Sequence, residues 1–166
     1  MLIQRGTGFR NLIVMKKTDW RVATLFTQAR HYSPVMPKLT KHWLGAYEND
    51  KLVGVLTLGW GTNPMGTIKK MFPELTTDDY YEIGKMCMDE SMPRNSESQM
   101  ISATIKWMRE NTPERKYLYT WADGIVGKPG YVYQAANFLY GGFYMGVTYM
   151  LQKVAKRYTF VQSNVR

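Results

Sequence analysis

One stretch of the chain, residues 80–122, restricts the fold more than any other, because strand and helix signals alternate along it. Residues 80–88 are predicted to form a strand that ends in a Pro-containing turn. Residues 96–111 are predicted to form a helix, since a Ser and a Gln three residues apart have capping-box spacing and apolar residues recur on one face. Residues 116–122 alternate with period two and predict another strand. This order indicates a sheet covered by helices.

The flanking segments extend the pattern on both sides. Before residue 80 the sequence predicts a strand at 9–15, a helix at 20–29, a hairpin of strands 42–47 and 51–58, and an irregular insertion at about 59–79. After residue 122 it predicts a short helix at 131–139, ended by two glycines, and strands at 143–151 and 157–162. We therefore expect an α/β (α+β) fold in which helices flank a mixed central sheet, with one domain over residues 1–166.

Composition limits the classes of protein to which the chain can belong. With 166 residues, of which 45% are hydrophobic and 21% charged, it is long enough for one domain with a full core. One cysteine and two histidines exclude a disulfide framework and leave too few ligands for a structural zinc site. No segment approaches the roughly 20 apolar residues of a membrane span, and no signal peptide is evident. We expect a globular protein of a reducing compartment without a membrane partner.

The formal charge of +9 is unevenly distributed. Residues 1–45 carry eight bases and one acid, residues 46–100 five bases and nine acids, and residues 101–166 nine bases and three acids. Both ends are therefore basic around an acidic middle, and the last fifteen residues interleave bases with aromatics. Such a pattern can hold phosphates and stack on exposed bases. From charge alone, a solvated basic surface is an equal alternative.

The start of the helix predicted at 96–111 is a candidate anion site. A helix N-terminus presents unpaired N–H groups and a partial positive charge, which favour a phosphate. Four polar side chains surround this N-terminus: Arg94, Asn95, Ser96 and Ser98. Ordinary capping is the commoner explanation for such a cluster.

Two further segments place polar groups at the ends of predicted elements. Asp123 closes the aromatic strand beside Trp121, where a carboxylate can have a raised pKa and act as a general base, although Asp-Gly is also a routine turn. His31, Tyr32 and Ser33 end the first predicted helix. A histidine there can be a base, a metal ligand or a partner of the helix dipole.

The short helix predicted at 131–139 carries Tyr131 and Tyr133, and Asn137 falls on the face of Tyr133 at a spacing of four. Asn137 stands between Ala136 and Phe138. A polar amide among apolar residues needs a hydrogen-bond partner, either backbone or ligand.

Several of these motifs resemble a known family. They are His-Tyr-Ser at 31–33, Trp-Leu-Gly-Ala-Tyr at 43–47 with Leu-Val-Gly-Val at 52–55, Pro-Arg-Asn-Ser-Glu-Ser at 93–98, Trp-Ala-Asp at 121–123, Gly127, and Tyr-Gln-Ala-Ala-Asn-Phe at 133–138. In this order they resemble the Mom DNA-modification proteins of Mu-like bacteriophages, which are similar to the GNAT acyltransferase superfamily. The resemblance extends from about residue 18 to residue 150.

The resemblance implies a function and its partners. Mom-like proteins attach a carbamoylmethyl group to adenine N6 in double-stranded DNA, which protects phage DNA from restriction enzymes in the host cytoplasm. A GNAT-like fold implies acetyl-CoA or another acyl donor between the strands at 80–88 and 116–122. The usual pyrophosphate loop, Gln/Arg-x-x-Gly-x-Gly/Ala, is replaced here by Arg-Asn-Ser-Glu-Ser-Gln at 94–99. The family has also been linked to iron, so a metal is left open, as is the oligomeric state.

The resemblance also assigns expected roles. An adenine flipped out of the duplex should contact a general base and a proton donor of the protein, and aromatic side chains should hold it. The catalytic residues expected are Asp123, Tyr133, Tyr32, His31 and Ser33. The cofactor-binding residues expected are Arg94, Asn95, Ser96 and Ser98. The substrate-binding residues expected are Trp121, Tyr131, Asn137 and Phe138. Two alternatives are a GNAT enzyme that acylates a small amine or a protein, and a non-catalytic DNA-binding anti-restriction protein.

Overall fold

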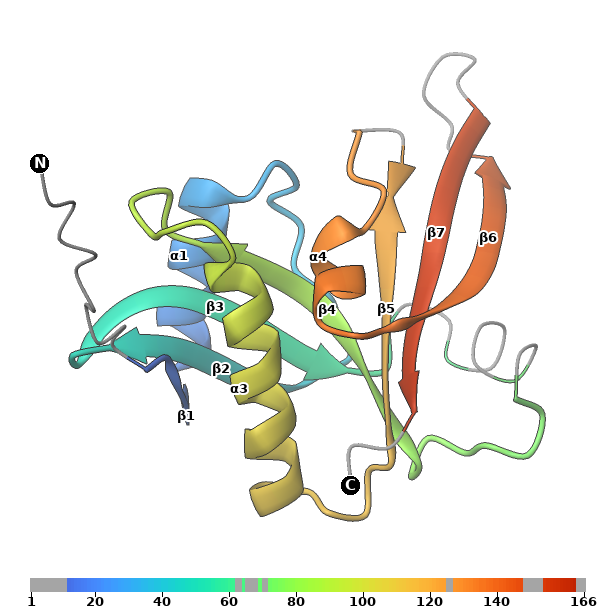
Figure 1. Ribbon diagram of the computed structural model, residues 1–166, viewed down its shortest axis with the longest axis horizontal. Helices are drawn as coiled ribbons and strands as arrows, with labels where there is room; N and C mark the ends of the chain where they lie inside the picture. The colour runs from blue at the N-terminus through green and yellow to red at the C-terminus, as the bar shows by residue number, and fades with distance from the viewer. Residues whose placement is uncertain are drawn as a thin grey trace, which may run out of the picture.

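The computed structural model describes residues 12–61, 64, 69, 72–124, 127–147 and 154–163. Over these residues the chain forms a seven-stranded mixed sheet with helices on its faces (Figure 1). The strand order is β1-β2-β3-β4-β5-β7-β6. The elements in chain order are β1 Val14–Lys17, α1 Trp20–Arg30, β2 Thr40–Glu48, β3 Lys51–Gly59, β4 Tyr80–Met88, α3 Ser96–Asn111, β5 Tyr117–Asp123, α4 Tyr131–Ala135, β6 Leu139–Val147 and β7 Val154–Ser163.

The pairing of β4 with β5 determines where the sheet opens. Each of the other paired strands in the described sheet is antiparallel to its neighbour, whereas β4 and β5 are parallel because α3 carries the chain back between them. Their register covers only three residues of each strand, 80–82 and 117–119. Beyond that point the strands diverge, and Figure 1 shows β5, β7 and β6 turning away from β1 to β4.

The two long helices lie on opposite faces of the sheet (Figure 1). One face of α3 is apolar, and Met100, Ile101 and Met108 are fully buried against Leu44, Leu56 and other strand residues of the main core. Helix α1 contributes less, because Ala23 and Thr27 are its buried residues. Asp19 caps α1 by accepting a hydrogen bond from the N–H of Arg21 at 2.7 Å. The fold therefore depends most on the packing of α3.

The predicted mixed α/β fold and most of the predicted elements are confirmed, including the strand at 80–88 and the helix at 96–111. The capping-box prediction is wrong. Asn95 is the N-cap, in the left-handed region at φ 71° and without a side-chain cap, while Ser96 Oγ donates instead to the Pro93 carbonyl at 2.7 Å. Part of the strand predicted at 9–15 lies outside the described residues, and the strand described there, β1, begins at Val14.

The prediction of a helix over 131–139 is also wrong in length. Helix α4 ends at Ala135, and β6 begins at Leu139, so the two glycines after residue 140 lie in a strand rather than ending a helix. Asn137 has a positive φ of 61°, which ends the helical path and which Asn tolerates better than most residues. The strand predicted at 143–151 therefore starts four residues earlier, and its last four residues lie outside the described part.

A search of the described residues finds no helix that is both long and apolar enough to cross a membrane.

Candidate functional site

A cavity of about 1210 Å³ opens where β4 and β5 diverge. Four segments line it, with Gly61 and Glu97 in addition: residues 31–33 and 35–39 after α1, 82–88 of β4, 121–123 of β5, and 127–133 in the turn before α4 and its first residues. The divergence exposes one edge of β4, because in the described sheet β4 pairs with β5 only as far as Glu82. The N–H and C=O groups of that edge are therefore open to a ligand that carries amides.

A β-bulge shapes the floor of the cavity at Gly84. The register of β4 on β3 skips this residue, and the N–H of Lys85 donates to Thr57 Oγ1 at 2.9 Å. A Cβ at Gly84 would lie 2.7 Å from Cγ of Pro37, so only glycine lets the segment after α1 cross β4 this closely. The bulge thereby brings residues 31–39 over the opened part of the sheet.

His31 lies inside the cavity as a neutral side chain. Its Nδ1 accepts a hydrogen bond from the N–H of Ser33 at 3.0 Å, and its ring stacks on Tyr32 with centroids 4.4 Å apart. Burial, reinforced by the positive charge of Lys85, lowers the pKa of His31 to about 4. At neutral pH this histidine carries no charge, so it is not the charged partner of the α1 dipole.

The low pKa of His31 predicts how stability depends on pH. The folded protein binds this proton more weakly than the unfolded chain, whose histidine pKa is 6.5, so the free energy of unfolding falls as pH falls from 6.5 towards 4. Because the ring is half exposed, solvent screens its interactions, and we expect the free energy of unfolding to fall by about 1–2 kcal/mol, which is less than the full pKa shift would give. Urea unfolding at pH 7 and pH 4.5 should show a smaller loss for His31→Asn than for wild type. An equal or larger loss in the variant contradicts the prediction.

Two lysines that the sequence did not single out join this cluster. Lys85 Nζ donates to the carbonyl of Ser33 at 3.0 Å, and burial lowers the pKa of Lys85. Lys128 Nζ lies 4.9 Å from the ring centroid of Tyr32, which is within cation–π range. The available signal for Lys85 was a lysine within a largely apolar strand. For Lys128 it was a cation between the glycines of the turn before α4.

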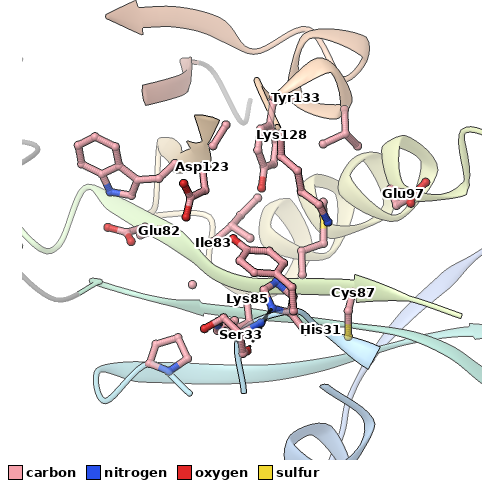
Figure 2. Close-up of a pocket in the computed structure, with 18 of the residues that line it drawn as sticks. His31, Ser33, Glu82, Ile83, Lys85, Cys87, Glu97, Asp123, Lys128 and Tyr133 are labelled. Carbon is pink, nitrogen blue, oxygen red and sulfur yellow. Dashed lines mark hydrogen bonds between the residues drawn. The ribbon is translucent and has the colours of Figure 1, made fainter. Parts of the chain in front are cut away.

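Two acidic side chains from neighbouring strands reach the same cavity. Asp123 ends β5, and Glu82 is the last residue of β4 that pairs with β5. Figure 2 shows both carboxyl groups on the cavity side. Glu82 is buried, and its carboxylate packs so closely against Gly61 that a Cβ there would collide with it. Sequence reasoning found Asp123 but missed Glu82, whose signal was an acid within a buried strand. Trp121, packed edge-to-face on Tyr119 at 5.3 Å, lines the wall beside Asp123.

Tyr133 supplies a hydroxyl to the same space. It comes from α4, and Figure 2 shows its hydroxyl pointing into the cavity between Asp123 and Lys128. Burial raises the pKa of Tyr133, and a hydrogen bond with Thr120 opposes that effect. The phenol therefore keeps its proton at neutral pH and can act as a donor.

The remaining candidate residues are not all brought to this cavity. Tyr131 is exposed at its rim, while Phe138 is buried in the core, 5.7 Å from the Tyr133 ring. The prediction that Asn137 shares a helix face with Tyr133 is wrong, because α4 ends first and Asn137 is an exposed turn residue.

The N-terminus of α3 contributes to the main cavity through Glu97. The four polar residues named for phosphate binding, Arg94, Asn95, Ser96 and Ser98, do not line it. Arg94 is exposed, and Ser98 lines a separate cavity of about 420 Å³ and donates to the Asn95 carbonyl at 2.9 Å. A donor molecule that binds along β4 would therefore have to extend beyond the cavity to contact these four residues.

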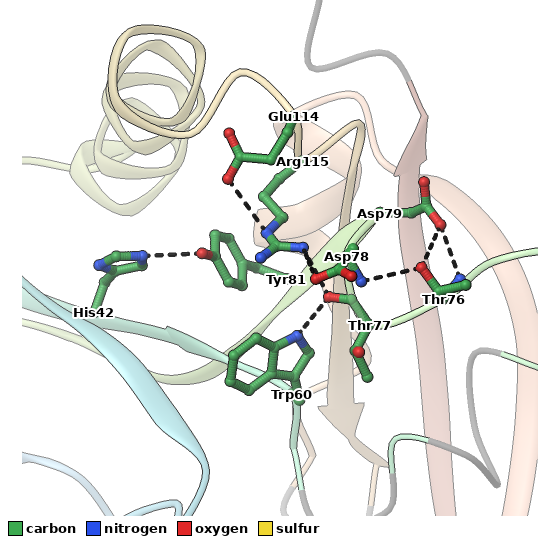
Figure 3. A network of polar contacts seen from close by, with 9 residues as sticks. All are labelled: His42, Trp60, Thr76, Thr77, Asp78, Asp79, Tyr81, Glu114 and Arg115. Atoms are coloured by element: carbon green, nitrogen blue, oxygen red, sulfur yellow. Dashed lines mark hydrogen bonds and ion pairs between the residues drawn. The ribbon is translucent and has the colours of Figure 1, made fainter.

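The ends of the expected insertion are joined at the base of β4 (Figure 3). The carbonyl of Thr77 accepts hydrogen bonds from Trp60 Nε1 at 2.8 Å and from Arg115 Nη1 at 3.0 Å. Arg115 also lies 5.0 Å from the ring centroid of Tyr81, whose hydroxyl is 3.0 Å from His42 Nε2. This network fixes where the insertion leaves and rejoins the sheet. Most of residues 62–71 lie outside the described part of the chain.

Within the residues that the structure describes, no three or more His, Cys, Asp or Glu side chains are grouped so that they could hold a metal ion. The iron that the resemblance implied therefore has no support in this part of the chain.

The comparisons with known proteins decide the family. A family model described as the Mom protein family matches residues 12–164. The chain belongs to the Mom protein family. It is 34% identical over 146 residues to the methylcarbamoylase mom of Escherichia phage Mu. This match covers 88% of the chain but 60% of the phage Mu protein, so the chain spans about three fifths of its relative's length.

The fold of this Mom family member is similar to the fold of GNAT acetyltransferases of known structure. The aminoglycoside acetyltransferase AAC(6')-Ib, solved with acetyl-CoA, aligns with a TM-score of 0.66 at 11% identity and covers 92% of this chain and 93% of its own. Arabidopsis thaliana NAA60 with acetyl-CoA gives 0.63 at 12% identity, covering 92% and 99%. An N-acetyltransferase from Staphylococcus aureus gives 0.61 at 16%, covering 93% and 98%. The GNAT-like fold is thus confirmed.

Proposed function

We propose that this protein is a phage DNA-modification transferase that places a carbamoylmethyl-type group on adenine N6 and so protects phage DNA from host restriction in the host cytoplasm. Membership of the Mom family and the 34% identity to a phage methylcarbamoylase support the proposal. The observation that carries it is that Asp123 and Tyr133 both line one cavity of about 1210 Å³, which is large enough for a nucleobase and a donor.

The donor is proposed to be of the acyl-coenzyme A type. The open edge of β4 from Ile83 to Met88 fits an arm that carries amides, because its backbone groups can bond as a further strand would. Arg94 and the backbone N–H groups at the start of α3 would hold the phosphates, with Asn95, Ser96 and Ser98 shaping that turn. When bound, such a donor would supply an electrophilic carbon attached to the coenzyme sulfur. A carbamoylmethyl product requires that N6 bond to a CH2 carbon that carries the amide, with the coenzyme thiolate as the leaving group, because attack at a thioester carbonyl would give an N6 amide instead.

The chain's own residues would move the protons. Adenine N6 is a poor nucleophile because its lone pair is delocalised into the ring, so removal of its proton must accompany bond formation. Asp123 accepts that proton as N6 bonds to the donor carbon. Tyr133, or Tyr32 on the opposite wall, gives a proton to the leaving group as its bond to that carbon breaks. The raised pKa of Tyr133 keeps it protonated for this role.

The adenine must leave the base stack to reach these groups. Trp121 in the cavity wall and Tyr131 at the rim are the aromatic side chains proposed to hold it. His31 and Ser33 lie on the opposite side, where their hydrogen bond fixes the backbone next to Tyr32. The basic residues outside the cavity would bind the phosphates of the duplex.

Expression of the protein together with a plasmid tests the proposal. We expect mass spectrometry of the digested plasmid nucleosides to show adenosine with the added mass of a carbamoylmethyl group, absent when an empty vector replaces the gene. Unchanged adenosine, despite folded and expressed protein, contradicts the proposal. Acylation of a protein or a small amine in the same cells would then favour an ordinary GNAT acyltransferase. Binding to DNA without any added mass on its nucleosides would favour a non-catalytic DNA-binding protein.

A further inference from the structure

The segment of residues 31–39, here called the strap, forms one side of the cavity mouth. It joins α1 to β2 without helix or strand, and most of its residues line the cavity. Several of them are also exposed to solvent. A residue that is both exposed and part of the cavity lining lies at the rim, so the strap meets any ligand that enters.

The strap is fixed rather than free. The carbonyl of Ser33 is held by Lys85 at 3.0 Å, and the carbonyl of Pro37 by Thr40 Oγ1 at 2.9 Å. At its end the carbonyl of Leu39 accepts a hydrogen bond from the N–H of Trp60 at 3.3 Å. Two prolines, at 34 and 37, further restrict its backbone. Side chains on the strap are therefore presented in defined positions.

Two aliphatic side chains project from this fixed segment. Val35 is 73% exposed and Leu39 44% exposed, and both line the cavity. Exposed apolar side chains also occur elsewhere on the described surface, as at Leu25, so it is the position of these two at the cavity mouth that sets them apart.

The charges around the mouth indicate which partner this is. Residues 20–47 contain four bases and no acid, and Lys38 of the strap and Lys128 opposite are both exposed and line the cavity. The acids Glu82 and Asp123 lie deeper, and Glu97 of α3 is the exposed acid among the lining residues. A polyanion is thus attracted to the lysines of the rim, while an uncharged base suits the interior.

We propose that Val35 and Leu39 form an apolar wedge that enters duplex DNA and fills the space left by the adenine turned into the cavity. The proposal rests on the proposed function and adds how the base is kept out of the stack. Apolar side chains that insert between base steps offset the cost of unstacking, and neighbouring lysines hold the phosphates. Tyr32 lies on the same strap and also lines the cavity.

The test compares two double variants of matched exposure. Val35→Ser/Leu39→Ser removes the wedge, whereas Val22→Ser/Leu25→Ser changes side chains on α1 that are 43% and 68% exposed and do not line the cavity. In plasmid-expressing cells we expect the first to lower the modified fraction of adenosine at least about tenfold and the second to leave it within about twofold of wild type. Equal modification by both variants and wild type overturns the wedge.

Binding to DNA separates a wedge from a simple surface contact. Fluorescence anisotropy would be measured on duplexes of plasmid sequence, either fully paired or with each adenine opposite cytosine, which lowers the cost of extruding the base. We expect Val35→Ser/Leu39→Ser to bind the paired duplex about tenfold more weakly than wild type does. We expect the variant and wild type to bind the mismatched duplex with about equal affinity. An equal loss on both duplexes overturns the wedge. A wild type that modifies no adenosine overturns the proposed function instead.

Discussion

We expect replacement of Asp123 by Asn to abolish the proposed adenine modification while the fold is kept. Asparagine has the size of aspartate but cannot accept the N6 proton, and loss of a general base typically lowers a rate by 10²–10⁴-fold. The side chain sits at the end of β5 on the cavity wall and outside the hydrophobic core, so its replacement leaves the packing of α3 on the sheet untouched. The measurement is the modified fraction of plasmid adenosine by mass spectrometry.

Asp50→Asn is the matched control for this variant. Asp50 lies in the turn between β2 and β3, has a positive φ of 61° that asparagine tolerates, and forms an exposed ion pair with Lys16. We expect full modification by Asp50→Asn and a melting temperature within a few degrees of wild type for both variants. Substantial modification by Asp123→Asn would remove Asp123 from its proposed role, and Glu82 would be the next carboxylate to replace.

We expect the affinity for duplex DNA to fall about 10³-fold between 50 mM and 200 mM salt. This is the loss expected for a protein that neutralises about six phosphates, because each contact releases bound counterions. The net charge of +9 and the exposed lysines at the cavity mouth are the basis of the expectation. Anisotropy titrations of a labelled duplex over a series of KCl concentrations measure the slope.

Two double variants identify where the phosphates lie. Lys38→Gln/Lys128→Gln removes two charges at the cavity mouth and should reduce the slope of log affinity against log salt by about two. Lys51→Gln/Lys106→Gln removes two exposed charges that do not line this cavity and should leave the slope nearly unchanged. A slope near zero for wild type would contradict DNA binding through phosphates, and equal slopes for the two variants would place the DNA elsewhere.

Local patterns in the sequence predicted the elements around the site well, because these patterns reflect which side of a strand or helix is buried. The period-two alternation before Asp123 placed that residue at a strand end, and the apolar face of residues 96–111 matched the helix that packs on the core. The error at Asn137 has an equally local cause. The spacing of four from Tyr133 and the apolar neighbours suggested a helical residue in need of a partner, whereas α4 ends at Ala135 and Asn137 adopts the positive φ that asparagine tolerates.

Other features of the site depend on contacts between distant segments. Glu82, Lys85 and Lys128 looked unremarkable in the sequence, and they reach the cavity because β4 and β5 part after three paired residues and the strap crosses the Gly84 bulge. Phe138 resembled a ligand-binding aromatic but is buried beside Tyr133. A motif lists neighbours along the chain, and it does not say which of them face the same space.

The sequence by itself determined the mixed α/β class, the order of most elements, the family and the basic character of the two ends, since hydrophobic periodicity, turn residues and charge are local properties. Only the tertiary structure decided that His31 is half-buried and neutral, that Arg94 lies off the main cavity, and that Val35 and Leu39 stand at its mouth. Those outcomes follow from burial, strand divergence and the crossing of the strap, which arise only when remote parts of the chain pack together.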